Sequence, residues 1–513
     1  MRKLEAMISV SGAVLLLSAA AQGATLEVGP GKTYTKPCDA IAAANPNDVI
    51  EVQPGTYTDS CYIQKAGLTV RGVGGRPKID LSGTDHPAGY KGIYVIGADN
   101  ITIENLELTG ANISCGNGAN GAGLRVEAPG LTVRNCFIHD NQNGILGGQG
   151  TVTIEYTEFS GNGWGDGCNC GGCTHNLYTG QAGGKLIFRY NYSHDIATDG
   201  HLLKSRADEN QILYNRFSGE SGHDSYAIDL PNGGLAIIVG NLVQKGPNPG
   251  NQILLTWGEE GNLKSDMRVF VANNTFVNDY TKGTFINIAG GGILTAHNNL
   301  FVGPGTVSNT GALSADNISG VDPLFADKAN YDYRLLVGSP AIDKGVDPGM
   351  ADAMSLTPTN QYVHPASTET RSMVGTALDV GAYEYGTSSG GAGGAAGAAG
   401  SGGTGVAGSG GTGSAGTGGT GVAGSGGTGT AGSGGASAGG NAGASTGGKA
   451  GTSPDGGTVD GGGSAGAPAP AADSDSDSGC GCRAAGRGRA SSLVALLLGI
   501  CAALRIARQR RRN

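Results

Sequence analysis

The sequence predicts an all-β solenoid of stacked coils, and three observations support this fold class. Segments of similar pattern begin at His175, Gly200 and Ser225, 25 residues apart, and a fourth begins at Asn251, 26 residues further on. Short runs of alternating β-branched residues recur along the chain without helical periodicity, and asparagine follows most of them. A unit of this length cannot bury its own apolar face, so successive units must stack on one another.

The two ends of the chain differ from the region between them. A basic start and an apolar run before Ala24 predict a signal peptide over residues 1–23, and therefore export. Residues 387–478 are almost entirely Gly, Ala, Ser and Thr, so they cannot bury enough apolar surface to offset chain entropy. We expect a flexible linker there, and one folded domain over residues 24–386.

The last segment, residues 479–513, combines three features in a fixed order. Cys480 and Cys482 flank one glycine, an apolar run follows over residues 491–504, and five arginines follow within residues 505–512. This order resembles the MYXO-CTERM sorting tail of myxobacterial surface proteins. The resemblance implies processing at the cysteine by a sorting protease and display at the cell surface. Without processing, the same residues predict a C-terminal transmembrane anchor with the arginines in the cytoplasm.

The charge balance bears on the partners. The chain has 33 basic and 42 acidic residues, a net charge of −9, and several of its basic residues belong to the tail. An acidic folded domain argues against nucleic acid as a partner. We expect a monomer that meets a polysaccharide through its folded domain and the membrane through its tail.

The entry to the solenoid contains a predicted helix and a predicted disulfide. Residues 38–44 favour a short helix, which would cover the open end of the first coil and prevent edge pairing. Cys38 and Cys61 would tie this helix to the coil, because exported proteins form disulfides.

Five further cysteines lie in the predicted domain. Cys115 and Cys136 are about one coil apart, so they are expected to pair with each other or with a cysteine-rich loop. That loop precedes His175 and has the ligand types of a zinc site, but the exported context favours disulfides over metal. Its cysteines are Cys168, Cys170 and Cys173.

Asparagines at the ends of the strands predict a ladder of stacked amides at a tight turn, with Tyr156 replacing one of them. This pattern and the entry helix resemble the right-handed parallel β-helix of the pectate-lyase-like superfamily, over nearly the whole folded region. The resemblance implies the fold but leaves the function open, because the superfamily holds lyases, hydrolases, epimerases and non-enzymatic adhesins. The asparagines are Asn105, Asn135, Asn191, Asn215, Asn241, Asn274 and Asn299.

Alignment of the repeated units predicts their register. Lys204 and Asp229 fall at equivalent positions of adjacent coils, about 4.8 Å apart, and are expected to pair. The pair has two interpretations, a simple neutralisation at the edge of the core or part of a catalytic site. The column expected to face inward consists of Leu177, Leu202, Ala227, Ile253 and Ile286, with Tyr178 facing outward.

The first functional hypothesis is a lyase that cleaves an acidic, uronate-containing polysaccharide by β-elimination. Elimination requires neutralisation of the carboxylate, a base and an acid, and four residues within two coils are candidates for these roles: Tyr178, His201, Lys204 and Arg206. The resemblance implies a Lys or Arg near the base position, often with Ca²⁺ held by aspartates. The sequence contains no Asp-rich calcium loop, so a calcium cofactor is expected only from the resemblance.

The substrate-binding candidates lie on the same units. Tyr226 and Trp257 are predicted to stack on sugar rings, although single aromatics also fit ordinary packing. Polar contacts are predicted from Asn176, Asp199 and Asp229.

Two alternatives to a lyase remain at this stage. A glycoside hydrolase would use paired carboxylates, and Asp199, Asp224 and Asp229 lie on adjacent coils, while an epimerase is known on the same fold. The absence of a complete catalytic motif favours a non-catalytic carbohydrate-binding or adhesion protein.

Overall fold

The computed structural model describes residues 23–84, 87–163, 174–180, 183–220 and 222–387. The predicted signal peptide, the linker, the sorting tail and the loop of Cys168, Cys170 and Cys173 lie outside the described residues. Within the described part of the chain, no helix is long and apolar enough to cross a membrane.

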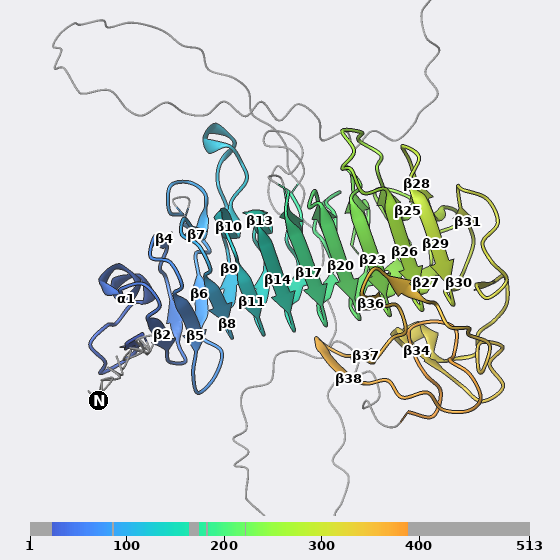
Figure 1. Ribbon diagram of the computed structural model, residues 1–513. Helices are drawn as coiled ribbons and strands as arrows, with labels where there is room; N and C mark the ends of the chain where they lie inside the picture. The colour runs from blue at the N-terminus through green and yellow to red at the C-terminus, as the bar shows by residue number, and fades with distance from the viewer. Residues whose placement is uncertain (1–22, 85–86, 164–173, 181–182, 221, 388–513) are drawn as a thin grey trace, which may run out of the picture. The chain divides into compact units, whose positions relative to one another are not determined.

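Three parallel sheets form the body of the described chain, and each coil contributes one strand to each sheet (Figure 1). Sheet A consists of β1 (Thr25–Val28), β2 (Val49–Val52), β5 (Thr69–Gly72), β8 (Thr102–Glu104), β11 (Thr132–Arg134), β14 (Thr151–Glu155), β17 (Lys185–Arg189), β20 (Glu209–Leu213), β23 (Leu235–Val239), β26 (Arg268–Ala272) and β29 (Ile293–His297). Sheet B consists of β3 (Thr56–Tyr57), β6 (Lys78–Asp80), β9 (Glu107–Thr109), β12 (Phe137–His139), β15 (Glu158–Ser160), β18 (Tyr192–His194), β21 (Arg216–Ser218), β24 (Leu242–Lys245), β27 (Thr275–Asn278), β30 (Leu300–Val302) and β32 (Ile318–Ser319). Sheet C consists of β4 (Cys61–Ile63), β7 (Gly92–Ile96), β10 (Ala122–Pro129), β13 (Asn143–Gln149), β16 (Leu177–Thr179), β19 (Leu203–Ser205), β22 (Ile228–Leu230), β25 (Ile253–Trp257), β28 (Thr284–Ile288) and β31 (Thr306–Ser308).

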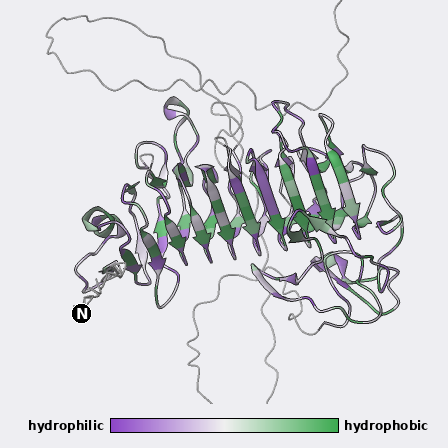
Figure 2. Ribbon diagram, in the orientation of Figure 1, coloured by the Kyte–Doolittle hydropathy of each residue, from purple (hydrophilic) through white to green (hydrophobic). Residues whose placement is uncertain are grey.

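One continuous apolar core fills the space between the three sheets. It runs from Val28 in the first coil to Phe301 near the last. Apolar and polar residues alternate along the strands in Figure 2, and the apolar member of each pair points inward. This arrangement confirms the predicted solenoid of stacked coils.

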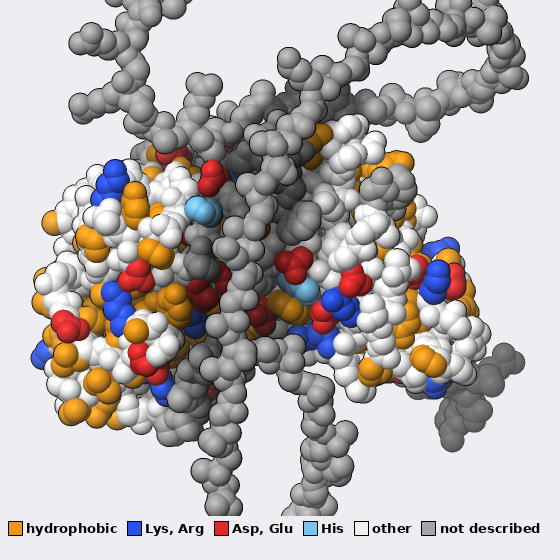
Figure 3. Space-filling view, turned by 180° about the vertical axis from the view of Figure 1, so that it is seen from behind, with side chains coloured by type: hydrophobic (Ala, Val, Ile, Leu, Met, Phe, Trp, Pro, Cys, Tyr) orange, Lys and Arg blue, Asp and Glu red, His pale blue; other side chains and the backbone are white. Residues whose placement is uncertain are grey.

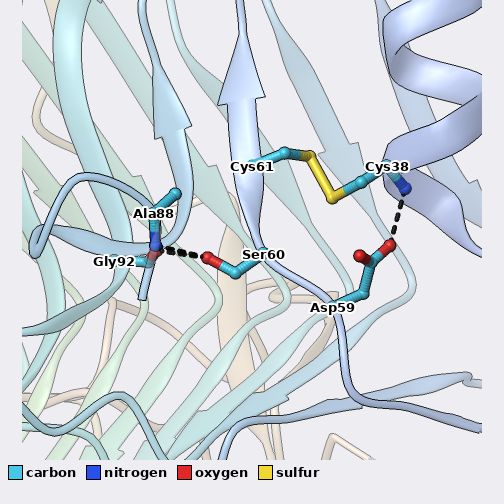
Figure 4. The surroundings of a disulfide bond; sticks show 6 residues. All are labelled: Cys38, Asp59, Ser60, Cys61, Ala88 and Gly92. Carbon is cyan, nitrogen blue, oxygen red and sulfur yellow. Dashed lines mark hydrogen bonds between the residues drawn. A yellow bond between two sulfur atoms is a disulfide. The ribbon is translucent and has the colours of Figure 1, made fainter. Parts of the chain in front are cut away.

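The N-terminal end is closed as predicted. Helix α1 (Pro37–Ala43) packs against β1 and β2, and the Cys38–Cys61 disulfide joins it to the first strand of sheet C (Figure 4). The Asp59 carboxylate accepts a hydrogen bond of 2.7 Å from the backbone N–H of Cys38.

The predicted pairing of Cys136 is wrong. Its thiol is free and fully buried in the core, and burial raises its pKa to about 11. Cys115, in the short 3-10 helix η1 (Cys115–Asn117), is disulfide-bonded, and its partner is not Cys136.

A buried asparagine ladder joins sheet A to sheet B over six coils. Each member after Asn191 accepts hydrogen bonds from the backbone and side-chain N–H groups of the member before it, at 2.9–3.1 Å. These amides satisfy one another's donors and acceptors, which is how buried polar groups avoid the cost of desolvation. The members are Asn191, Asn215, Asn241, Asn274, Asn299 and Asn317.

The first part of the predicted ladder is present but displaced by one position: Asn135 Nδ2 donates to Asn105 Oδ1 at 3.1 Å, outside the buried ladder. Asn105 and Asn135 precede the ladder position and have φ values of 54° and 51°, a left-handed conformation that asparagine tolerates. Tyr156 occupies the same left-handed position, with φ 51°, so Thr157 rather than Tyr156 continues the ladder.

Asn241→Ala is expected to lower the free energy of unfolding by about 2–4 kcal/mol, because it leaves several buried partners unsatisfied. These partners include the backbone N–H of Asn215 and the carbonyl of Ile212. Chemical denaturation of the variant measures the loss. Asn117→Ala, at an exposed asparagine of η1, is the control and is expected to change stability by less than about 0.5 kcal/mol. Equal effects of the two substitutions would contradict a stabilising ladder.

The segment that follows the coils packs on the outside of sheets A and B. It contains three antiparallel hairpins and the 3-10 helix η3 (Lys328–Asn330): β33 (Phe325–Asp327) with β34 (Asp332–Leu335), β35 (Met350–Ala351) with β36 (Met354–Ser355), and β37 (Asn360–Val363) with β38 (Ser367–Thr370). One apolar cluster joins it to Tyr192 and Leu242 of sheet B, and another joins it to Leu213 and Ile237 of sheet A. Among the described residues, no apolar cluster joins it to the outer face of sheet C.

Candidate functional site

The outer face of sheet C carries a row of polar residues from consecutive strands. Tyr178 of β16 pairs in register with Lys204 of β19, Lys204 with Asp229 of β22, and Asp229 with Thr256 of β25. Figure 3, which views the molecule from behind, shows acidic and basic side chains interspersed over that side of the molecule.

The predicted register is therefore wrong by one residue between β16 and β19 and between β22 and β25, and by two residues between β25 and β28, where Leu255 rather than Ile253 pairs with Ile286. Leu203, rather than Leu202, faces inward beside Ile228, and Ile228 pairs with Leu255. A slip of one residue moves a side chain to the other face of a strand, so Lys204 and Asp229 share the outward row with Tyr178 instead of the inward column.

Lys204 lies between two carboxylates. Its Nζ is 3.2 Å from Asp229 Oδ2 and 2.8 Å from Glu260 Oε1, and it lies 5.4 Å from the centre of the Tyr178 ring. Only 2% of the Lys204 side chain is exposed, compared with 32% of Glu260. The predicted pairing of Lys204 with Asp229 is present, and Glu260 provides a second partner.

Arg206 follows β19 and uses three nitrogens in three directions. Its Nε donates to the Tyr178 hydroxyl at 2.6 Å, one terminal nitrogen donates to Asn232 Oδ1 at 2.6 Å, and the other donates to Glu260 Oε2 at 2.5 Å. Burial by itself lowers the pKa of Arg206, but the hydrogen bonds to Tyr178 and Glu260 raise it above its ordinary value. Arg206 and Lys204 thus present two cations to one carboxylate.

Glu260 belongs to a glycine-bounded turn, residues 258–261, that follows β25. Glu259 of the same turn accepts hydrogen bonds from the hydroxyls of Tyr226, at 3.0 Å, and Thr256, at 2.9 Å. Asn232 donates to the carbonyl of Gly261 at 2.7 Å, which links the turn to the partner of Arg206.

His201 packs beside this row, whose members are themselves buried. Its Nδ1 is 3.0 Å from Asp229 Oδ2, and its ring packs against the rings of His175 and Tyr226. Burial lowers its pKa well below the ordinary value, and nearby Lys204 contributes in the same direction. As whole residues, His201 is 3% exposed and Lys204 1% exposed, so burial does not distinguish the two, and a direct role of His201 stays a prediction. Its contact with Asp229 positions the carboxylate that holds Lys204.

Acidification is expected to destabilise the protein through His175 and His201. Burial lowers the pKa of both below 6.5, so between 6.5 and their folded values the unfolded chain binds protons that the folded chain does not. Each then lowers the free energy of unfolding by up to about 1.4 kcal/mol per pH unit as the pH falls.

Denaturation with guanidinium chloride between pH 7 and pH 5 measures this slope. His201→Gln is expected to reduce it, and comparison of the two proteins cancels the contributions of the other titrating groups. A variant with an unchanged slope would show that His201 is not the group responsible.

The remaining predicted residues have different environments. Trp257 is fully buried in the core and donates from Nε1 to the carbonyl of Gly234, so the prediction that it stacks on a sugar is wrong. Asn176 is also fully buried and accepts from Asn162 in a second amide ladder, so it is not a substrate contact. Asp199 is exposed on the loop before β19, and Tyr226 is half-buried next to Glu259.

The residues around Lys204 do not fit calcium. Ca²⁺ needs six or more oxygen ligands, whereas the Asp229 carboxylate contacts Lys204 and His201, and the Glu260 carboxylate contacts Lys204 and Arg206. Among the described residues, the one group with metal-ligand geometry is His194, Asp195 and Glu220, which lies away from this row and extends from sheet B.

The arrangement around His194 recurs elsewhere as a structural feature. His194 contacts the aspartate that follows it, Asp195, and a glutamate of the preceding coil, Glu158, and it stacks on Tyr192. His139 makes the same three kinds of contact: with the aspartate that follows it, with a glutamate of the preceding coil and with the ring of Phe137. The repetition indicates a stabilising arrangement on the outside of sheet B rather than a metal centre.

Sequence reasoning missed the residues that complete the site: Glu259, Glu260, Asn232 and His175 as a packing partner. The run Gly258-Glu-Glu-Gly261, directly after a strand, could have indicated the turn, because a glycine on each side of two glutamates is typical of a turn that exposes both carboxylates. Asn232 similarly opens the Asn-Gly-Gly turn after β22.

Comparison with known proteins supports the fold. The family described as "Right handed beta helix region" matches residues 78–243. The described chain is a right-handed parallel β-helix. Among solved structures, the β-helix matches pectate lyase Pel9A at 17% sequence identity with a TM-score of 0.50, covering 71% of this chain and 97% of that one.

Other structural matches are more distant. The pectin methylesterase from Aspergillus niger is 16% identical, with a TM-score of 0.30, over 60% of this chain and 94% of that one. Pectin methylesterase PemA from Erwinia chrysanthemi is 14% identical, with a TM-score of 0.30, over 59% and 94%. No curated protein sequence matches the chain.

Proposed function

We propose that this β-helix is an exported lyase that cleaves a uronate polysaccharide by β-elimination on the outer face of sheet C. The observation that carries the proposal is the pair of cations, Lys204 and Arg206, that converges on the single carboxylate of Glu260. A uronate presents the same chemical group. The fold shared with pectate lyase Pel9A is compatible with this proposal.

In the proposed reaction, the two cations bind the uronate carboxylate and stabilise the negative charge that develops when the neighbouring proton leaves. Tyr178 is the proposed proton acceptor, because Arg206 donates to its oxygen and Lys204 lies beside its ring. Asp229, supported by His201, keeps the ammonium group of Lys204 in place. In this step Tyr178 takes the proton in its phenolate form, the bond to the leaving oxygen breaks and a double bond forms in the uronate ring. The proton that Tyr178 has taken then passes to the leaving oxygen, which returns Tyr178 to its starting form.

In this scheme, Lys204 and Arg206 neutralise the substrate carboxylate, which a bound calcium ion would otherwise do. The carboxylates of the site are already paired with Lys204 and Arg206, so we propose that cleavage does not depend on calcium. The residues of the predicted tail, 479–513, lie outside the described chain, and we propose that they display the enzyme at the cell surface.

The test is incubation of the purified protein with a panel of uronate polysaccharides, with and without a calcium chelator. Ultraviolet absorbance of unsaturated ends is followed together with reducing ends. We expect absorbance that persists in the chelator and disappears in Lys204→Ala. Reducing ends without absorbance would indicate a hydrolase, and loss of activity in the chelator would overturn the calcium-free scheme.

The second candidate function is a non-catalytic carbohydrate-binding protein. The burial of Lys204 behind Glu260 favours it, because a base or acid that solvent cannot reach does not meet a substrate without a rearrangement. Binding of a glycan without formation of unsaturated ends or new reducing ends would establish this alternative.

A further inference from the structure

Glu260 makes a pair of contacts that is unusual for an exposed surface carboxylate. Its Oε1 contacts the buried ammonium of Lys204, and its Oε2 contacts the guanidinium of Arg206. Each oxygen therefore has its own cation, which is the geometry that a bound carboxylate ligand adopts. Glu260 nevertheless comes from a turn at the surface, with 32% of its side chain exposed.

The turn that carries Glu260 has open space on its Gly261 side. Gly258 and Gly261 bound it with φ values of 78° and 72°, a conformation that favours glycine. A Cβ placed on Gly261 would meet no atom within 4 Å, so open space lies beside the turn. Hydrogen bonds from Tyr226 and Thr256 to Glu259 and from Asn232 to Gly261 hold the turn, and Thr256 and Asn232 are buried. The backbone N–H of Glu260 also donates to the carbonyl of Pro231 at 3.0 Å, so a displacement of Glu260 moves its side chain and not the backbone.

Lys204 and Arg206 share Glu260 as a carboxylate partner, and both lose that partner if Glu260 moves away. The ammonium group of Lys204 is almost fully buried, and Asp229 alone would then balance two cations. A neutral sugar that displaced Glu260 would leave Lys204 with Asp229 alone and Arg206 without its carboxylate. A sugar that carries a free carboxylate would restore both contacts.

We propose that Glu260 is an internal ligand of a carboxylate subsite formed by Lys204 and Arg206, and that a substrate carboxylate displaces it. This inference rests on the proposed function, and it narrows the substrate class to uronates with a free carboxylate. A methyl-esterified uronate is excluded, because an ester cannot neutralise the two cations that Glu260 leaves behind. The exchange of one carboxylate for another keeps the charge of the site balanced.

The test compares the wild-type protein with Glu260→Gln, using galacturonate trisaccharide as the probe in isothermal titration calorimetry. The amide keeps the shape of the side chain but no longer competes as an anion, so we expect the dissociation constant to fall by about tenfold. The methyl-esterified trisaccharide is expected to bind neither protein.

Glu209→Gln is the matched control. Glu209 is also 32% exposed and lies 2.9 Å from a lysine, Lys185, but on sheet A. It is expected to leave the affinity unchanged. Glu260→Asp, which keeps the charge but is too short to contact both cations, is expected to give a smaller gain, and it replaces Glu260→Gln if that variant does not fold.

The outcomes separate this inference from the proposed function. If the wild type binds the free acid and Glu260→Gln binds equally or more weakly while folded, the internal ligand is overturned and the proposed function stands. If only the variant binds, Glu260 blocks the subsite and the inference holds. If neither binds any uronate, the proposed function fails and the inference fails with it. Tight binding of the methyl ester would overturn the predicted selectivity.

Discussion

Arg206→Lys is expected to lower kcat/KM for a uronate polysaccharide by about a hundredfold to a thousandfold. The guanidinium of Arg206 contacts Tyr178, Asn232 and Glu260 at the same time, through three separate nitrogens. A lysine ammonium is a single point charge and cannot hold three partners in a planar fork. The variant therefore keeps the charge but loses the alignment of the Tyr178 hydroxyl. The rate of formation of unsaturated ends measures the loss.

The control for this prediction is Arg189→Lys on sheet A. Arg189 also pairs with a glutamate, Glu155, and lies over a tyrosine ring, that of Tyr190, but it does so outside the proposed site. Its activity is expected to match that of the wild type. An Arg206→Lys variant with full activity would show that charge alone suffices at this position and would remove Tyr178 from the proposed role.

Lys245→Met is expected to lower the free energy of unfolding by about 3–5 kcal/mol, the cost of leaving a buried charge without its partner. Lys245 Nζ pairs with the Asp224 carboxylate and donates to the carbonyl of Ser225 at 2.6 Å, and neither side chain of the pair is exposed. Burial lowers the pKa of Lys245 and raises that of Asp224, so each charge depends on the other. Thermal and chemical denaturation measure the loss.

Two comparisons make this prediction specific. Lys185→Met removes an ion pair that is about one third exposed on both sides, and it is expected to cost less than about 1 kcal/mol. A double variant, Lys245→Met with Asp224→Asn, removes both charges and is expected to regain part of the stability. A small effect of Lys245→Met alone would mean that Asp224 takes up a proton without consequence for the fold.

The Asp224–Lys245 pair also explains the position of the candidate site. The predicted hydrolase carboxylate Asp224 is buried against Lys245, so it does not face a substrate. It lies four residues before Ile228, where β22 begins, and this strand carries Asp229. The pair therefore anchors the turn that leads sheet B into the strand supporting Lys204.

The sequence alone predicted the features that depend on repetition. The spacing of the units, the alternation of apolar residues and the asparagines from Asn191 to Asn299 each recur once per coil, and a repeated signal is strong even where each instance is weak. The Cys38–Cys61 disulfide was predictable because both residues lie within the first coil and the helix that covers it. The same reasoning placed Tyr178, Lys204 and Arg206 on neighbouring coils.

The side of sheet C on which each of these side chains lies could not be predicted, because a strand with an alternating pattern is compatible with two registers that differ by one residue. Loops of different length between coils shift the pairing by one residue, and such a shift moved Lys204 outward. Trp257, an apparent surface aromatic, became a core residue by the same rule. Glu260 pairs with residues more than fifty positions earlier in the chain, and only the folding of the turn after β25 onto the outer face of sheet C brings them together.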